Sequence, residues 1–198
     1  VIYRGNNFPE EYQGNSFVCE PSGNFIRRNR HIETGGNIIA KNAENGKEWM
    51  SSSDERFRPV NLYNGPSGGL YIVDMYRGLV QHKIYLTSYL RNQAESRGLE
   101  KGIDKGRIYR VVYKGNNTSS TKLAKANGNK LVSALNSDNG WVRDTAQRLL
   151  IESKDDVNYK LANLAKEGNH ALGRVHALWS LEGRAAISPD IILDALKA

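Results

Sequence analysis

The pattern of hydrophobic and polar positions changes near Gly115. Before this residue, short runs of Val, Ile, Tyr and Phe are separated by Gly, Pro and Asn, which is typical of strands joined by turns. After it, apolar residues recur at three- and four-residue spacings, which is typical of amphipathic helices. The pattern predicts a strand-rich domain over residues 1–115, a polar linker over 116–129 and a helical domain over 130–198.

Two turns in the strand-rich part contain the same Pro-Ser-Gly triplet, at residues 21–23 and 66–68. Proline presets the backbone angle that a turn needs, and the Gly or Asn that follows tolerates positive φ, so each triplet predicts a hairpin. The triplets lie 45 residues apart. A strand-rich repeat of about 40–50 residues is the blade period of a β-propeller. Two unrelated hairpins in a β-sandwich are the alternative.

A helical pattern interrupts the strand-rich part at residues 80–98, with Gly98 as a stop signal. Residues 107–113 then alternate between polar and apolar positions, as a half-buried strand does. We therefore expect a helical insertion near residues 80–98 between two strands of one blade.

The apolar stripes of the helical part repeat along the chain. Leu131 and Leu135 recur as Leu161 and Ala165, 30 residues later, and the other stripes recur at a similar spacing. Such a period is typical of stacked helix pairs, so it predicts a short α-solenoid. The tryptophans on these stripes, Trp141 and Trp179, are predicted to lie in its core.

Charge and cysteine content narrow the partners. The 198 residues carry a net charge of +7, but the basic residues are spread along the chain, so a nucleic-acid partner is not expected. No apolar run is long enough to span a membrane. The single cysteine, Cys19, leaves no haem-attachment motif in this chain. Because the sequence starts at Val1 without a signal-peptide pattern, we expect it to begin inside a longer protein.

Four segments then point to a known family. The phrase over residues 57–77, running from Phe-Arg-Pro-Val to Asp-Met-Tyr-Arg, is followed by Gly-Arg-Ile-Tyr-Arg-Val at 106–111. These resemble the last blades of the glucose/sorbosone dehydrogenase-like (quinoprotein-type) β-propellers, in the bacterial membrane-bound dehydrogenase group. Residues 14–24 resemble the preceding blade, and residues 139–150 resemble the first HEAT-like helical repeat that follows the propeller in these proteins.

The resemblance implies a multidomain protein, all-β and then all-α. This chain would hold about two last blades of a six-bladed propeller, with an inserted helix, and then a short HEAT-like solenoid. It implies oxidation of a sugar-like alcohol or aldehyde with pyrroloquinoline quinone and calcium, in the bacterial periplasm or at the cell surface. The missing blades or a partner protein would complete the site. The alternative function is a non-catalytic glycan- or protein-binding module.

The residues that match the family phrase supply the candidate ligand-binding groups. Arg58, directly before a proline at a strand start, would clamp a carboxylate-rich quinone or an acidic sugar, or else pin an adjacent loop. Asp74, at a strand end, would orient an arginine or a ligand, or else cap its own turn. Calcium ligation through its oxygens is a further alternative, which the lack of an Asp/Asn-rich loop like that of an EF-hand disfavours. Tyr76 would stack on a sugar or quinone, or else lie in the core, and Arg77 adjoins it.

Two further residues complete the candidate set. His82 is the best available general base for a sugar hydroxyl, because its pKa suits proton transfer near neutrality, and a structural hydrogen bond is its alternative role. Glu20 precedes a predicted turn and would face the propeller mouth, or else form a salt bridge. No residue of this chain is assigned as a metal ligand.

Overall fold

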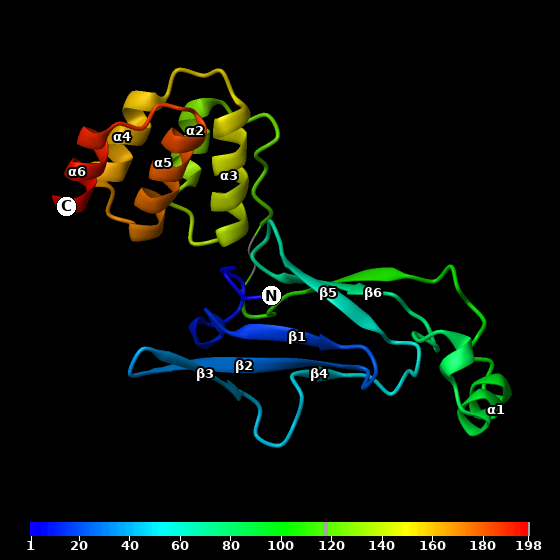
Figure 1. Cartoon of the computed structure of the whole chain (residues 1–198). Helices are drawn as coiled ribbons and strands as arrows, with labels where there is room; N and C mark the ends of the chain where they lie inside the picture. Colours follow the sequence, from blue (N-terminus) through cyan, green and yellow to red (C-terminus); the bar gives the residue numbers. More distant parts are fainter. Residues whose placement is uncertain (117–118, 198) are drawn as a thin grey trace. The chain divides into compact units, whose positions relative to one another are not determined.

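The computed structural model describes residues 1–116 and 119–197, apart from the side chain of Lys83, and divides into two compact units (Figure 1). We call them the sheet unit and the helical unit. The sheet unit comprises Val1–Tyr3, Phe8–Gly65 and Gly69–Asn116. The helical unit comprises Arg4–Asn7, Pro66–Gly68 and Asn117–Ala198. Residues 117–118, which fall in the predicted linker, lie outside the described residues.

The first sheet of the sheet unit is antiparallel and has the order β1-β2-β3, with β4 pairing to β2 (Figure 1). A short 3-10 helix, η1, precedes it. The bounds are η1 (Glu10–Tyr12), β1 (Ser16–Glu20), β2 (Phe25–Thr34), β3 (Asn37–Asn42) and β4 (Met50–Ser51). The β1–β2 turn places Asn24 at φ 59°, in the left-handed region that Asn tolerates.

The second sheet is also antiparallel and has the order β5-β6-β7. The chain leaves β6, forms two short helices and returns as β7. The bounds are β5 (Pro59–Asn64), β6 (Leu70–Asp74), η2 (Lys83–Tyr85), α1 (Ser88–Ser96) and β7 (Arg107–Val111). Thr87 caps α1, because its side chain accepts a hydrogen bond from the backbone N–H of Leu90 at 3.3 Å.

The two sheets share one core, since β1 packs against β5. Aromatic rings fill its centre: Tyr3 stacks on Phe8 with 4.7 Å between ring centroids, and Phe17 meets Trp49 edge-to-face at 4.8 Å. The other buried members are Ile26, Phe57, Leu62, Leu70 and Ile72.

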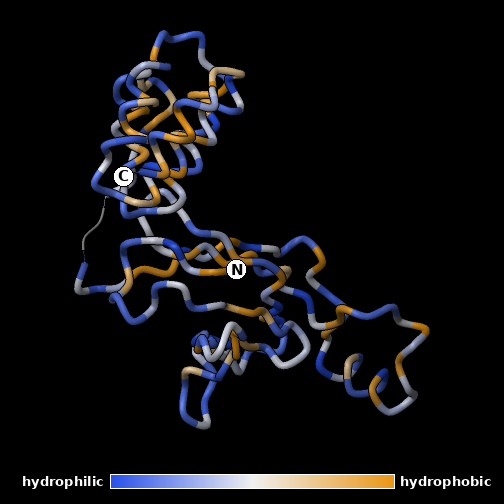
Figure 2. The backbone as a smooth tube through the Cα atoms, turned by 60° about the vertical axis from the view of Figure 1, so that its left-hand side comes forward, coloured by the Kyte–Doolittle hydropathy of each residue, from blue (hydrophilic) through white to orange (hydrophobic). Residues whose placement is uncertain are grey.

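The helical unit contains α2 (Gly128–Ala134), α3 (Gly140–Glu152), α4 (Asn158–Glu167), α5 (Ala171–Gly183) and α6 (Pro189–Lys197). Helix α3 packs against α2 and α5, and α4 packs against α5 and α6. In Figure 2, hydrophobic (orange) and hydrophilic (blue) stretches alternate along the helices of this unit. The buried core is made of Leu123, Leu131, Leu135, Val142, Ala146, Leu150, Val157, Leu161, Ala165, Ala177 and Leu181. Trp179, predicted in the core, is instead 58% exposed.

The predicted fold class, propeller blades followed by a HEAT-like solenoid, is wrong. The described residues form a mixed fold of two small antiparallel sheets and six α-helices, with no closed barrel or propeller among them. Both Pro-Ser-Gly triplets do fall between the paired strands of a hairpin, β1–β2 and β5–β6. The sheets around them differ, however, in strand number and order. The shared triplets therefore reflect local turn chemistry rather than a repeated blade.

None of the helices in the described ranges is both long and apolar enough to cross a membrane.

Candidate functional site

Arg58, the residue before β5, donates hydrogen bonds to four carbonyl oxygens of its own chain. Its Nε bonds the carbonyl of Arg77 at 2.8 Å and its Nη2 that of Gly78 at 2.7 Å. Its Nη1 bonds the carbonyls of Pro21 and Ser22 at 2.6 and 3.2 Å. Burial lowers the pKa of this guanidinium. The side chain thus ties the β1–β2 turn to the segment after β6, and four of its five donors are occupied.

Asp74, the last residue of β6, is only 1% exposed. Its Oδ1 accepts hydrogen bonds from the backbone N–H groups of Arg58 and Tyr76, both at 2.8 Å. Its Oδ2 lies 3.8 Å from Nε of Arg107. The carboxylate therefore organises the turn after β6 and pairs two neighbouring strands, β5 and β6, at their ends.

Tyr76 and Arg107 stack beside this carboxylate. The guanidinium carbon of Arg107 lies 3.4 Å from the ring centroid of Tyr76, a cation–π contact. Tyr76 adopts φ 48°, in the left-handed region that non-glycine residues rarely occupy. Nearby, a hydrogen bond from the backbone N–H of Arg56 lowers the pKa of Asp54, with a smaller contribution from the Tyr76 side chain. The structure thus brings Arg58, Asp74 and Tyr76 together in an internally paired cluster.

The remaining predicted residues lie apart from this cluster or serve the backbone. Oε1 of Glu20 accepts a hydrogen bond from the N–H of Ser22 at 3.0 Å, so its carboxylate caps the β1–β2 turn. Arg77 contributes its carbonyl to Arg58. His82 is exposed, and its ring meets Tyr85 edge-to-face at 6.1 Å. No hydrogen bond within the described ranges joins the His82 ring to Arg58 or Asp74.

A pocket of about 460 Å³ opens beside Arg58 and beneath α1. Its charged lining consists of Arg58, Glu55 and Arg97, and its apolar wall includes Leu86 and Leu99. Glu55 forms an ion pair with Arg97. The pocket is therefore bordered by charges that already have partners in the sheet unit.

The cofactor pair implied by the family resemblance has no clear set of ligands among the residues that the structure describes. Calcium takes several carboxylate and carbonyl oxygens, and the described ranges contain no group of three or more His, Cys, Asp or Glu side chains that could hold a metal. Arg58, the predicted clamp for the quinone, is directed to backbone carbonyls. These residues do not form a site that fits the pair. The cofactors therefore stay a prediction, and no chemical step is derived from them.

A larger groove, of about 900 Å³, lies in the helical unit. We call it the lysine groove. The segment 120–126 forms one wall and the face of α3 forms the other. The lining residues are Pro66, Ser120, Thr121, Lys122, Leu123, Ala124, Lys125, Ala126, Lys130, Trp141, Thr145, Arg148 and Leu149.

The floor of the lysine groove is the edge of the helical core. Leu123 is buried, and Trp141 and Leu149 are half-buried against the same cluster. Two hydrogen bonds fix the end of the wall at the carbonyl of Pro66, one from the N–H of Thr121 at 3.2 Å and one from Nδ2 of Asn139 at 3.3 Å. The groove is therefore built on ordered apolar packing.

Basic side chains surround this apolar floor. Lys122, Lys125 and Lys130 are exposed, and none of them has an ion-pair partner among the described residues. No Asp or Glu lines the groove. Arg148 alone is neutralised, because its Nη1 bonds both carboxylate oxygens of Glu152 at 2.9 Å. The arrangement combines a positive rim with an apolar floor.

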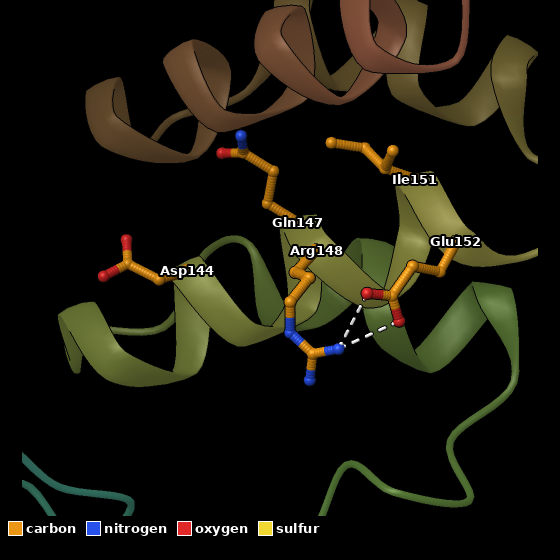
Figure 3. Close-up of a pocket in the computed structure, with 5 residues that line it drawn as sticks. All are labelled: Asp144, Gln147, Arg148, Ile151 and Glu152. Carbon is orange, nitrogen blue, oxygen red and sulfur yellow. Dashed lines mark hydrogen bonds and ion pairs between the residues drawn. The ribbon is translucent and has the colours of Figure 1, made fainter.

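A smaller pocket, of about 280 Å³, lies along α3 (Figure 3). The side chains of Gln147 and Ile151 point toward the neighbouring helix, while Arg148 turns to Glu152. Oε1 of Gln147 lies 2.6 Å from Nδ1 of His176 on α5. Polar side chains of this pocket are thus paired within the helical unit, and one of these pairs joins α3 to α5. We call this α3–α5 contact the seam between the two helices.

Sequence reasoning missed the lysine groove. It placed Trp141 in a solenoid core and residues 122–129 in a linker. The signal that would have revealed the groove is the run Lys-Leu-Ala-Lys-Ala at 122–126, where basic and apolar residues are interleaved. That pattern suits a segment with its apolar residues against a core and its basic side chains facing solvent.

The chain belongs to a family described as a domain of unknown function (DUF7133), whose model matches residues 1–115. No curated protein and no solved structure matches the chain. The resemblance to quinoprotein-type propellers stays a prediction.

Proposed function

We propose that this chain is a non-catalytic binding module that receives a segment of another protein in the lysine groove. The observation that carries the proposal is the groove itself. At about 900 Å³ the groove is at the upper end of the size range of ligand sites. Its floor is apolar and includes a half-buried tryptophan, Trp141. Such anchoring surfaces supply most of the free energy of binding in protein interfaces.

The state of the polar residues in the sheet unit supports a non-catalytic role. A general base must be held within hydrogen-bond reach of the reacting group and oriented by a partner. His82 is exposed and its ring meets that of Tyr85, while Arg58 and Asp74 are engaged with backbone groups. Arg58 and Asp74 therefore stabilise turns of the sheet unit.

The lining chemistry favours a polypeptide over a glycan. Sugar hydroxyls are bound by carboxylate and amide side chains that accept and donate together. The lysine groove has none of these, and its uncharged polar side chains are Ser120, Thr121 and Thr145. An apolar side chain of a partner protein would gain more from contact with Trp141 and Leu149 than a sugar would.

A peptide selection tests the proposal. A random peptide library is selected on the full chain, and the affinity of enriched peptides is measured by fluorescence anisotropy. Thr145→Trp, on the groove face of α3, fills the groove and should weaken binding by at least about tenfold. Lys154→Trp adds the same side chain at an exposed position of the helical unit outside the groove and should leave binding unchanged.

Two results would contradict the proposal. One is equal binding of the enriched peptides to both tryptophan variants, which would place their site elsewhere. The other is dye reduction by the chain with an aldose, pyrroloquinoline quinone and calcium that is lost in His82→Gln, which would make the protein an enzyme.

A further inference from the structure

We infer that the lysine groove takes an acidic segment of a partner protein, one in which carboxylates flank apolar side chains. The inference rests on the proposed function and specifies the chemistry of its partner. It follows from the sign of the charges at the groove, from their position relative to the apolar floor, and from the shape of that floor.

The charges at the groove are of one sign. Lys122 and Lys125 come from the wall segment and Lys130 from α2, and all three are exposed without an ion-pair partner in the described part of the chain. Elsewhere in the helical unit, Lys166 and Lys197 both face Asp194, at 3.8 and 3.5 Å. The groove therefore carries uncompensated positive charge, which attracts anionic partners and raises their rate of association.

The position of the charges specifies more than net attraction. Within the run 122–126, Leu123 is 4% exposed and joins the core, whereas Lys122 and Lys125 lie at the exposed rim. Trp141 and Leu149 continue the apolar floor from α3. An apolar centre with a charged rim is the usual anatomy of a protein interface. The complementary ligand has an apolar residue at its centre and acidic residues on either side.

The floor argues against a nucleic acid as the partner. Single-stranded nucleic acids are bound by successive aromatic side chains on which bases stack, along a basic track for the phosphates. The lysine groove offers a single aromatic side chain, Trp141, and its other floor residues are aliphatic. The apolar side chain of a peptide fits such a floor better than a row of bases does.

Changing one side chain at position 145 tests the sign of the charge. Thr145 is half-buried in the groove wall, so Thr145→Asp adds a carboxylate at the site and Thr145→Asn adds a neutral side chain of the same shape. The probe is a labelled peptide of alternating Glu and Leu, compared with Gln/Leu and Lys/Leu peptides of equal length. We expect Thr145→Asp to bind the Glu/Leu peptide about tenfold more weakly than Thr145→Asn does, because the two side chains differ in charge and not in shape.

Neutralising the rim provides a second, independent variant. The triple change Lys122→Gln, Lys125→Gln and Lys130→Gln should weaken the Glu/Leu peptide by about tenfold or more and remove most of the salt dependence of its binding. The control carries Lys101→Gln, Lys105→Gln and Lys154→Gln, outside the groove. Both triple variants lower the net charge from +7 to +4, three lysines being neutralised in each. The control should bind as the unchanged chain does.

The outcomes separate this inference from the proposed function. If the Gln/Leu or Lys/Leu peptide binds as tightly as the Glu/Leu peptide, and Thr145→Asp weakens none of them, the acidic partner is overturned while the groove remains a peptide site. If no peptide binds, and Thr145→Trp affects no enriched library peptide, both fail. If a single-stranded oligonucleotide displaces the Glu/Leu peptide and binds more tightly, the partner is a nucleic acid and the inference is overturned.

Discussion

The Arg58 pocket of the sheet unit and the lysine groove of the helical unit are both lined by charged and apolar residues, yet they treat their charges in opposite ways. In the Arg58 pocket, the guanidinium of Arg58 donates hydrogen bonds to four backbone carbonyls of its own chain, and Glu55 forms an ion pair with Arg97. At the groove, by contrast, none of the three rim lysines forms an ion pair with a carboxylate among the described residues. These lysines are Lys122, Lys125 and Lys130.

This difference separates architecture from recognition. A charged group that is hydrogen-bonded within the chain contributes to the stability of the fold, and removing it leaves buried acceptors without donors. A charged group that is exposed and unpaired beside an apolar floor contributes little to stability and is available to a partner. Substitutions in the two places should therefore affect different measurements.

Removing Arg58 should have the largest effect on stability. Arg58→Ala leaves the carbonyls of Pro21, Ser22, Arg77 and Gly78 without this donor, so we expect a loss of about 2–4 kcal/mol in the free energy of unfolding. Urea unfolding followed by circular dichroism measures it. Arg110→Ala, at an exposed position of β7, is the control and should cost less than about 0.5 kcal/mol.

If Arg58→Ala is as stable as the unchanged chain, the hydrogen bonds of Arg58 do not stabilise the fold. The contrast between a structural Arg58 and binding lysines would then fail, and Arg58 would become a candidate for ligand binding.

The roles of these two places were visible in the sequence to different degrees. The Pro-Ser-Gly triplets predicted turns because turn conformation depends on the residues at the turn. The sheets could not be predicted in the same way, since β6 pairs with β7 across η2 and α1, and β2 pairs with β4 across β3 and the loop that follows it. Such pairings depend on contacts between residues distant in the sequence.

The same limit explains the candidate residues. For Arg58 the sequence left two roles open, because the carbonyls that accept its hydrogen bonds belong to backbone and have no residue signature. For Trp179, the apolar periodicity correctly predicted a helix. Periodicity does not reveal, however, whether another element covers a given face of a helix, and this side chain is 58% exposed. The lysine groove was hidden because one of its two walls, the segment 120–126, has no regular secondary structure.

Asp74 should give the next largest effect. Asp74→Ala removes the acceptor of two backbone N–H groups, those of Arg58 and Tyr76, at a position that is 1% exposed. We expect a loss of about 2 kcal/mol in the free energy of unfolding. Asp74→Asn keeps a side-chain oxygen acceptor and should cost less.

Hydrogen exchange of the amides of Arg58 and Tyr76 locates the effect. Protection of these amides that is unchanged in Asp74→Ala would show that the carboxylate does not organise this turn, and the sheet-unit cluster would lose its architectural role.

Asn139 links stability and recognition in one side chain. Its Oδ1 accepts from the N–H of Trp141 at 3.0 Å, capping α3, and its Nδ2 donates to the carbonyl of Pro66 at 3.3 Å. Asn139→Ala should cost about 1 kcal/mol and weaken peptide binding in the lysine groove. Asn139→Ser retains a capping oxygen but loses the amide donor.

Comparing these two variants separates the roles of the cap and the wall. Thermal unfolding should find Asn139→Ser close to the unchanged chain, while anisotropy should find it weakened in peptide binding. Peptide binding that follows stability alone would mean that the Pro66 contact does not shape the groove.

His176 should give the smallest effect, and its sign follows from proton linkage. Burial lowers the pKa of its imidazole in the folded chain, against the raising effect of Asp144 and together with the lowering effects of Arg143, Arg4 and His170. The unfolded chain therefore binds more protons as the pH falls below about 6.5, so acidification through that window favours unfolding. The helical unit should therefore lose stability as the pH falls through this window.

His176→Gln tests this account, because glutamine offers a hydrogen-bonding group toward Gln147 without titrating. Thermal unfolding of the two chains between about pH 5.5 and pH 7.5 should show a dependence in the unchanged chain that the variant lacks. If both chains lose the same stability over this window, a group other than His176 titrates. Peptide binding in the lysine groove should be insensitive to this substitution at neutral pH, since His176 lies outside the groove lining. A change in peptide affinity without a change in stability would instead couple the seam between α3 and α5 to recognition, and the separation between the two kinds of charge would no longer hold.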